Sequence, residues 1–303
     1  MENEKTVFGA PTDPDALPRA RRLYALLRKE EGKRILTAQQ EGPGRMRHDM
    51  EMDYLKELTG HLPAIRGLDF IHNDFDGCVE RALRWNDAGG IVTVCWHTGA
   101  EGIGYPDSKE ESPDIGLLLK KGSEENGRLM RRWEDAAKAL LRLQERNVPV
   151  LWRPFHKFDG GWFWWGKGGG ALFAALWREM KRVFQREYGL HNLLWVLGYA
   201  DDVLDGWYPG GESADLLGSD TYRSETVHRS AYERLAALDA GKPKCFHECG
   251  KLPLPERFFA EGAPWVYVMP WHGRWLTADN DPGRVKAFYD SEKTVCLDEL
   301  PPF

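Results

Sequence analysis

Long hydrophobic runs and regularly spaced cysteines are both missing from this chain of 303 residues, and each absence narrows the class of protein. No run approaches about 18 apolar residues, so we expect no membrane-spanning helix and no membrane partner. The five cysteines have no regular spacing, which favours reduced, buried thiols over a disulfide framework. The acidic stretch Met1–Pro14 lacks the apolar core of a signal peptide. We therefore expect a cytoplasmic chain as written, or a secreted one if a signal peptide has been removed.

Excess positive charge is also lacking, because the formal net charge is −6. Phosphate binding needs clustered lysine and arginine, so we expect no nucleic-acid partner. The sequence has no P-loop, no nucleophile-elbow serine and no phosphate-binding glycine loop. His72, His247 and His272 do not have the spacing of metal ligands, so we predict neither a catalytic metal nor a cofactor.

Aromatic residues, by contrast, are abundant, with 13 tryptophans in the chain. They are densest in the segment Trp152–Gly166, which reads W-R-P-F-H-K-F-D-G-G-W-F-W-W-G and also carries basic, imidazole and carboxylate groups. Flat aromatic faces stack on the C–H surface of a sugar ring, while polar groups bind its hydroxyls. The segment therefore predicts a carbohydrate-binding site.

Short apolar runs alternate with amphipathic helical patterns along the whole chain. This alternation predicts a parallel sheet covered by helices, and the strand count fits an α/β fold with a single (β/α)8 TIM barrel over residues 1–303. A doubly wound open sheet is the alternative, but no G-x-G-x-x-G follows the first strand. The predicted strands are Arg34–Gln39, Pro63–Asp69, Ile91–His97, Val150–His156, Leu193–Gly198, Leu216–Asp220, Lys244–Glu248 and Trp265–Met269. The predicted helices are Leu17–Lys29, Asp49–Thr59, Cys78–Asp87, Leu129–Arg146, Leu172–Arg186, Ala231–Leu238, Pro255–Ala260 and Pro282–Ser291.

Polar or aromatic residues stand at or just beyond the ends of several predicted strands. Packing does not require such residues there, whereas barrel enzymes build their active sites at the carboxyl ends of the strands. The barrel rim is therefore predicted to bind ligand or carry out chemistry. The residues concerned are Asp69, Trp96, His97, His156, Lys157, Asp220, Glu248 and Trp271.

The tryptophan-rich segment resembles the active-site stretch of glycoside hydrolase family 26, the β-mannanase family, whose pattern is R-P-F-H-E-M-N-G-x-W-F-W-W. The resemblance runs in order from about Ile35 to Trp275. It implies a retaining mechanism with Glu248, in C-F-H-E-C-G, as the nucleophile. It also implies that Lys157 occupies the position of the family's acid/base glutamate. His156 and Tyr222 resemble the family's residues that support the nucleophile.

The same resemblance implies a set of sugar contacts around these positions. It assigns His97 and the platform Trp271 to the −1 sugar, and Trp162 to the −1/+1 subsites. For Trp164 and Trp165 the sequence leaves packing and sugar stacking equally open. The predicted substrate-binding residues are Trp96, His97, Arg153, Asp159, Trp162, Asp220 and Trp271.

Lys157 changes the expected chemistry, because an ammonium is a poor acid for a sugar leaving group and cannot act as a base. An ion pair with Glu248 is expected. Two function classes follow. The first is a monomeric glycosidase acting on β-1,4-mannan or a related β-glycan, with impaired activity or with Asp159 or Glu101 as substitute acid. The second is a non-catalytic carbohydrate-binding barrel, either a pseudoenzyme or an inactivated variant.

Overall fold

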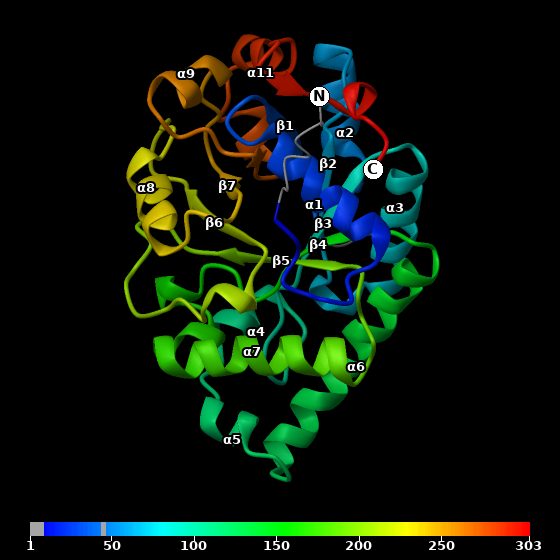
Figure 1. Cartoon of the computed structure of the whole chain (residues 1–303), viewed down its shortest axis with the longest axis vertical. Coiled ribbons are helices and arrows are strands. Elements are labelled where there is room, and N and C mark those ends of the chain that lie inside the picture. The colour runs from blue at the N-terminus through cyan, green and yellow to red at the C-terminus, as the bar shows by residue number, and fades with distance from the viewer. Residues whose placement is uncertain (1–8, 44–46) are drawn as a thin grey trace, which may run out of the picture.

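The computed structural model describes residues 9–43 and 47–303. Its central sheet is a closed barrel of parallel strands, because β1 pairs in parallel with both β2 and β8. The predicted (β/α)8 barrel is therefore confirmed, and Figure 1 shows the helices surrounding it. The barrel strands are β1 Ile35–Gln40, β2 Ile65–Asp69, β3 Ile91–Cys95, β4 Val150–Arg153, β5 Leu193–Gly198, β6 Leu216–Thr221, β7 Lys244–Cys249 and β8 Tyr267–Pro270.

The helices that cover the barrel bury one apolar side each. In α7, Phe173, Leu176, Trp177, Met180 and Phe184 recur at helical spacing and are all buried. Within residues 9–43 and 47–303, no helix is long and apolar enough to cross a membrane. The covering helices are α1 Pro18–Glu30, α2 Met50–Thr59, α3 Phe75–Asp87, α6 Glu124–Glu145, α7 Gly170–Arg186, α8 Arg229–Leu238, α9 Pro255–Ala260 and α11 Pro282–Tyr289.

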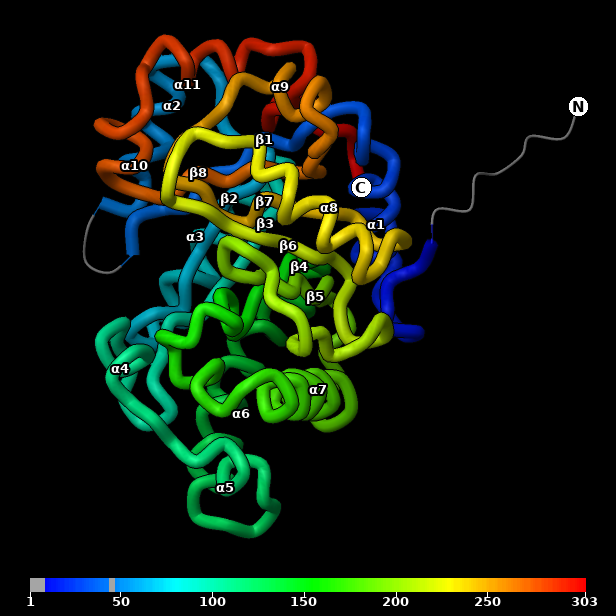
Figure 2. Tube along the Cα trace, turned by 90° about the vertical axis from the view of Figure 1, so that its left-hand side faces the viewer, coloured from blue at the N-terminus to red at the C-terminus, as the bar shows by residue number. Residues whose placement is uncertain are grey.

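Several short elements were not predicted. Helices α4 (Tyr105–Glu110) and α5 (Ile115–Leu119) lie between β3 and α6, and α5 forms one end of the molecule in Figures 1 and 2. Helix α10 (Arg274–Thr277) follows β8, and the two-residue strand β9 (Thr294–Val295) adds to β1. The remaining short helical turns are η1 Ile71–Asn73, η2 Phe158–Gly160, η3 Trp164–Gly166, η4 Gly211–Ser213 and η5 Leu297–Glu299.

Two strands were predicted to be longer at their carboxyl ends than they are. Strand β3 ends at Cys95, not at His97, and β4 ends at Arg153, not at His156. After Arg153 the chain turns, and both Phe155 and Lys157 adopt left-handed backbone conformations, with φ of 50° and 57°. A left-handed residue cannot continue a strand, so His156 and Lys157 lie in the loop above β4.

Strand β7 is irregular where it reaches the rim. Its register with β8 shifts between Phe246 and Cys249. In a regular strand, consecutive side chains point to opposite faces, and a bulge re-aims them. The irregularity accounts for a feature that regular geometry would forbid, since His247 and Glu248 both contact Arg153.

Candidate active site

Glu248 is fully buried at the end of β7 and is held by donors on both carboxylate oxygens. The Arg153 guanidinium donates to Oε1, and the Tyr222 hydroxyl donates to Oε2 at 2.9 Å. The His156 Nε2 lies 3.5 Å from Oε1. Burial alone would raise the pKa of Glu248, but the Lys157 and Arg153 cations hold it well below its usual range. Glu248 is therefore an oriented, ionised carboxylate.

Lys157 faces Glu248 directly, as the sequence led us to expect. Its Nζ forms ion pairs with Glu248 Oε2 and with Asp220 Oδ2, the latter at 3.0 Å. It also lies 4.6 Å from the ring centre of Tyr222 and 5.6 Å from that of Trp271. Burial would lower the pKa of Lys157, but the Asp220 and Glu248 carboxylates raise it above its ordinary value. The group is an ammonium that retains its proton.

Two histidines lie beside this ion pair. Asp69 Oδ2 accepts from His97 Nδ1 at 2.5 Å, while Oδ1 accepts from the backbone N–H groups of His97 and Ile71 at 3.0 Å each. The ring of His156 packs edge-on against that of His97, with centroids 4.5 Å apart. Burial and then His97 hold the pKa of His156 well below its ordinary value, so this ring is neutral.

A cleft of about 540 Å³ opens above these groups. Its walls are mainly aromatic, and its floor includes Asp69, His97 and Lys157. Trp162 is 40% exposed, which is unusual for so large an apolar side chain and suits a stacking surface. The aromatic residues that line the cleft are Tyr105, Trp162, Phe163, Tyr222, Trp271 and Trp275.

The model of glycosyl hydrolase family 26 matches residues 12–299 of this chain. The chain belongs to that family. The mannan endo-1,4-beta-mannosidase of Thermothelomyces thermophilus is 31% identical over 95% of this chain and 62% of its own length. Mannan endo-1,4-beta-mannosidase B of Piromyces sp. is 27% identical over 96% of this chain and 53% of its own length. The chain thus spans somewhat more than half the length of these two curated relatives.

Solved structures agree with this assignment. A ruminal GH26 endo-beta-1,4-mannanase superimposes with a TM-score of 0.92 at 27% identity, covering 100% of this chain and 72% of the other. The β-mannanase from a symbiotic protist of the termite Reticulitermes speratus, complexed with gluco-manno-oligosaccharide, gives a TM-score of 0.88 at 28% identity. That match covers 97% of this chain and 98% of the other.

Three of the tryptophans considered for sugar binding are buried in the hydrophobic core of this family 26 protein. Trp164 Nε1 donates to the Thr98 carbonyl at 2.8 Å, and Trp165 Nε1 donates to the His156 carbonyl at 3.0 Å. Both side chains are buried, which resolves the open alternative in favour of packing. Trp96 is also buried and does not line the cleft, and its contact with sugar stays a prediction.

Several polar residues from the prediction also lie outside the cleft lining, among them Asp220, His156 and Glu248, whose contacts are given above. Asp159 accepts backbone hydrogen bonds from Ala200 and Leu204, at 2.7 and 3.0 Å, and burial raises its pKa to about 6. It therefore holds the chain after β5 in place. Arg153 lies buried against Glu248, so it positions the carboxylate. Glu101, the other substitute acid considered, forms an ion pair with Arg128 at 3.2 Å.

The sequence prediction missed several residues that line the cleft. Tyr105 begins α4 and is 43% exposed, with its ring against those of His97 and Phe163. Its only sequence signal was the following proline, which suits the first turn of a helix. Trp275 lies on α10 and packs against Tyr222 at 4.9 Å. The other lining residues that were not predicted are Pro43, Ile71, Lys109, Phe163 and His272.

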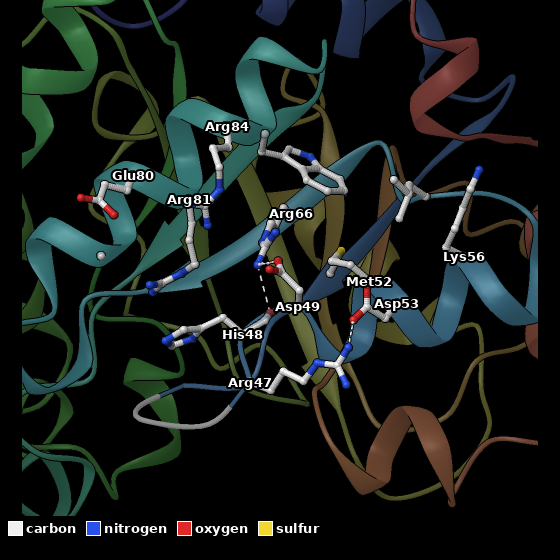
Figure 3. A pocket seen from close by; sticks show the side chains of 13 residues that line it. Arg47, His48, Asp49, Met52, Asp53, Lys56, Arg66, Glu80, Arg81 and Arg84 are labelled. Carbon is white, nitrogen blue, oxygen red and sulfur yellow. Dashed lines mark hydrogen bonds and ion pairs between the residues drawn. The ribbon is translucent and has the colours of Figure 1, made fainter.

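A second hollow lies on the outer side of the barrel between α2 and α3 (Figure 3). It contains many arginines, but acidic partners engage three of them. Arg66 pairs with the buried Glu41 and with Asp49, Arg81 pairs with Glu41 and Asp74, and Arg47 pairs with Asp53. This hollow is cross-linked by ion pairs, and we assign it a structural role.

Proposed function

We propose that this chain binds β-1,4-mannan or a related β-glycan in the aromatic cleft, and that Glu248 is a nucleophile in retaining glycoside chemistry. The observation that carries the proposal is an ionised Glu248, oriented by Arg153 and Tyr222. The printed names of the relatives, mannan endo-1,4-beta-mannosidases, support mannan as the glycan.

The first chemical step requires a leaving group that can depart without help. Glu248 attacks the anomeric carbon, a bond to its carboxylate oxygen forms, and the glycosidic oxygen leaves with the bonding electron pair. A sugar alkoxide needs a proton at this point. Lys157 is the group at the acid/base position, and its raised pKa makes it a weak donor. Polymer cleavage is therefore slow, while aryl glycosides with acidic phenols react.

The second step is impaired for the same reason. Water must lose a proton as it attacks the glycosyl-enzyme, and the Lys157 ammonium has no free electron pair with which to accept it. A small anion such as azide is already a nucleophile and needs no base. Azide would therefore release the sugar as a β-glycosyl azide with retained configuration.

A second candidate function is glycan binding without turnover. It is favoured by one contact, the Lys157 ammonium placed on Oε2 of Glu248, with the Glu248 side chain fully buried. A nucleophile must be uncovered to reach an anomeric carbon. If Lys157 does not move when glycan binds, the barrel acts as a lectin.

The test uses 2,4-dinitrophenyl β-mannoside, with and without azide, and follows phenol release and sugar products. We expect a burst of phenol followed by slow turnover, acceleration by azide, and a β-mannosyl azide product. The matched control is Glu248→Gln, which should abolish the burst. A native protein that binds mannohexaose in calorimetry but gives no burst would leave only the binding function.

A further inference from the structure

Three soft ligand groups converge beneath the cleft: the Cys95 thiol and the imidazoles of His97 and His156. Cys95 ends β3, His97 follows two residues later, and His156 comes from the turn above β4. One sulfur and one nitrogen from each ring lie within 4.8 Å of one another, and all three residues are buried. Thiolate and imidazole are the preferred ligands of zinc.

His156 lacks the partners that a buried imidazole normally has. Neither of its ring nitrogens makes a hydrogen bond to any described residue, and its nearest charged neighbour is Glu248 Oε1, 3.5 Å from Nε2. Burying such a ring without a partner is costly. A ligated metal ion would satisfy one of these nitrogens.

His97 is already oriented as a ligand would be. Asp69 Oδ2 holds its Nδ1 at 2.5 Å, which leaves Nε2 as the other available atom. Metal-binding histidines almost always pair their second nitrogen with a carboxylate or carbonyl in this way. His97 also lines the cleft, so a bound ion would have a coordination position directed toward it.

The local charge suits a cation better than an anion. With both imidazoles neutral, as metal ligation requires, Asp69, Asp220 and Glu248 supply three negative charges and Arg153 and Lys157 two positive ones, which leaves a net charge of −1. Loss of the Cys95 proton would make it −2. A divalent ion then balances the charge of the group.

We propose that Cys95, His97 and His156 form a binding site for a zinc ion. On binding, a bond forms between zinc and the Cys95 sulfur, and the thiol proton is released to solvent. Zinc bonds of about 2.3 Å to sulfur and about 2.0–2.1 Å to nitrogen draw the three atoms together, which small side-chain rotations supply. The sequence spacing concealed this site, because His156 lies in the loop above β4, far along the chain from Cys95 and His97. The proposal goes beyond glycan binding and does not depend on it.

The experiment counts metal on the full chain without any sugar present. Protein stripped with chelator is incubated with zinc sulfate, passed through a desalting column and measured by mass spectrometry of the elements. We expect about one zinc per native chain, and loss of that zinc in Cys95→Ser. The matched control is Cys245→Ser, a buried thiol on β7 outside the group, which should retain zinc. Cobalt(II) added to native protein should give a sulfur-to-cobalt charge-transfer band that Cys95→Ser lacks.

If Cys95→Ser does not fold, Asp69→Asn provides an independent reading. Removing the carboxylate behind His97 should weaken cobalt binding about 10- to 100-fold, while the charge-transfer band persists at saturation. Native protein that retains no zinc would overturn the proposal. So would zinc retained equally by folded Cys95→Ser, which would point instead to Asp13, Asp15 and His191, the other grouping of potential ligands in the described chain.

Discussion

The two sides of the cleft floor are built in different ways, although they meet in one ion pair. On the β7 side, Glu248 sits on a strand, and side chains of Arg153 and Tyr222 donate to its two oxygens. On the β4 side, Lys157 sits in a turn with a left-handed backbone, anchored by its N–H to the Gly198 carbonyl at 2.6 Å. Arg153 and Tyr222 thus hold Glu248 in addition to the Lys157 ammonium.

Under the proposed assignment of Lys157 to the acid/base position, this difference explains how the barrel holds a lysine there. A carboxylate in this turn would be repelled by the carboxylates of Asp220 and Glu248. The Lys157 ammonium is attracted by both. The support for the nucleophile remains complete. On the proposed function, a lysine at this position removes a chemical step without dismantling the site, and the variants below change either the β7 side or the β4 side.

The largest effect is expected from Arg153→Met, which attacks the β7 side. It leaves Glu248 buried with one oxygen lacking its charged donor, and breaking a buried pair in this way typically costs about 3–5 kcal/mol. Because the native pKa of Glu248 is depressed, its ionisation stabilises the fold above its unfolded-state pKa, and this stabilisation is lost as pH falls toward the native value. Urea unfolding of Arg153→Met should therefore show a large loss of stability at pH 7 and a smaller loss in acid. An unchanged midpoint at pH 7 would mean that Arg153 is not what holds Glu248.

The next largest effect is expected from Lys157→Glu, which attacks the β4 side. A carboxyl group beside Asp220 and Glu248 would have a raised pKa and could donate and accept the proton that both steps require. Hydrolysis of β-mannan should rise by about 100-fold or more, measured as reducing sugar released. Lys157→Gln is the matched control, because it removes the ion pair without providing an acid. A native chain that cleaves polymer well and is slowed by Lys157→Glu would contradict the proposed role of this residue.

The contrast between the two sides also marks the limit of what the sequence could predict. The barrel was predictable because its strands are apolar runs buried on both faces, as in Leu193–Gly198. The end of β4 was not predictable, because Phe155 and Lys157 occupy the left-handed positions and no glycine marks the turn. The pairing of Glu248 with Lys157 and Tyr222 was expected from the resemblance to family 26, which implies that these residues meet. The short elements α4, α10 and β9 have too few residues for a periodic pattern.

Burial in the tryptophan-rich segment was equally hidden, because neighbouring positions have opposite surroundings. Trp162 is exposed in the cleft, whereas Trp164 and Trp165 find backbone carbonyl partners inside the fold. Those partners belong to other loops, so the local sequence cannot identify them. The contacts of Asp159 were hidden for the same reason, since its partners Ala200 and Leu204 follow a different strand.

A smaller effect is expected from Tyr222→Phe, which removes one donor from the β7 side and leaves Lys157 on the same oxygen. Losing this hydrogen bond to a charged group should cost about 1.5 kcal/mol, the low end for such bonds, because Oε2 keeps its ion pair with Lys157. The burst of phenol from an aryl mannoside should slow about tenfold, while mannohexaose affinity stays nearly constant. A loss of affinity with an unchanged burst would make Tyr222 a sugar contact instead of a support for Glu248.

The smallest effect is expected at Trp162, in the aromatic wall of the cleft. This side chain follows the β4 turn, is half-exposed and lines the cleft, so it has a free aromatic face for a sugar ring. Stacking of this kind contributes about 0.5–1.5 kcal/mol, so Trp162→Ala should weaken mannohexaose binding by roughly 2- to 10-fold, with little change in melting temperature. Trp164→Phe is the matched control two residues away, where the ring is buried and loses its hydrogen bond to Thr98 together with part of its packing. It should lower stability by at least about 1 kcal/mol and leave affinity unchanged. If both variants lose affinity equally, the wall acts as one packed unit, and the distinction between a binding ring and a packing ring in this segment is wrong.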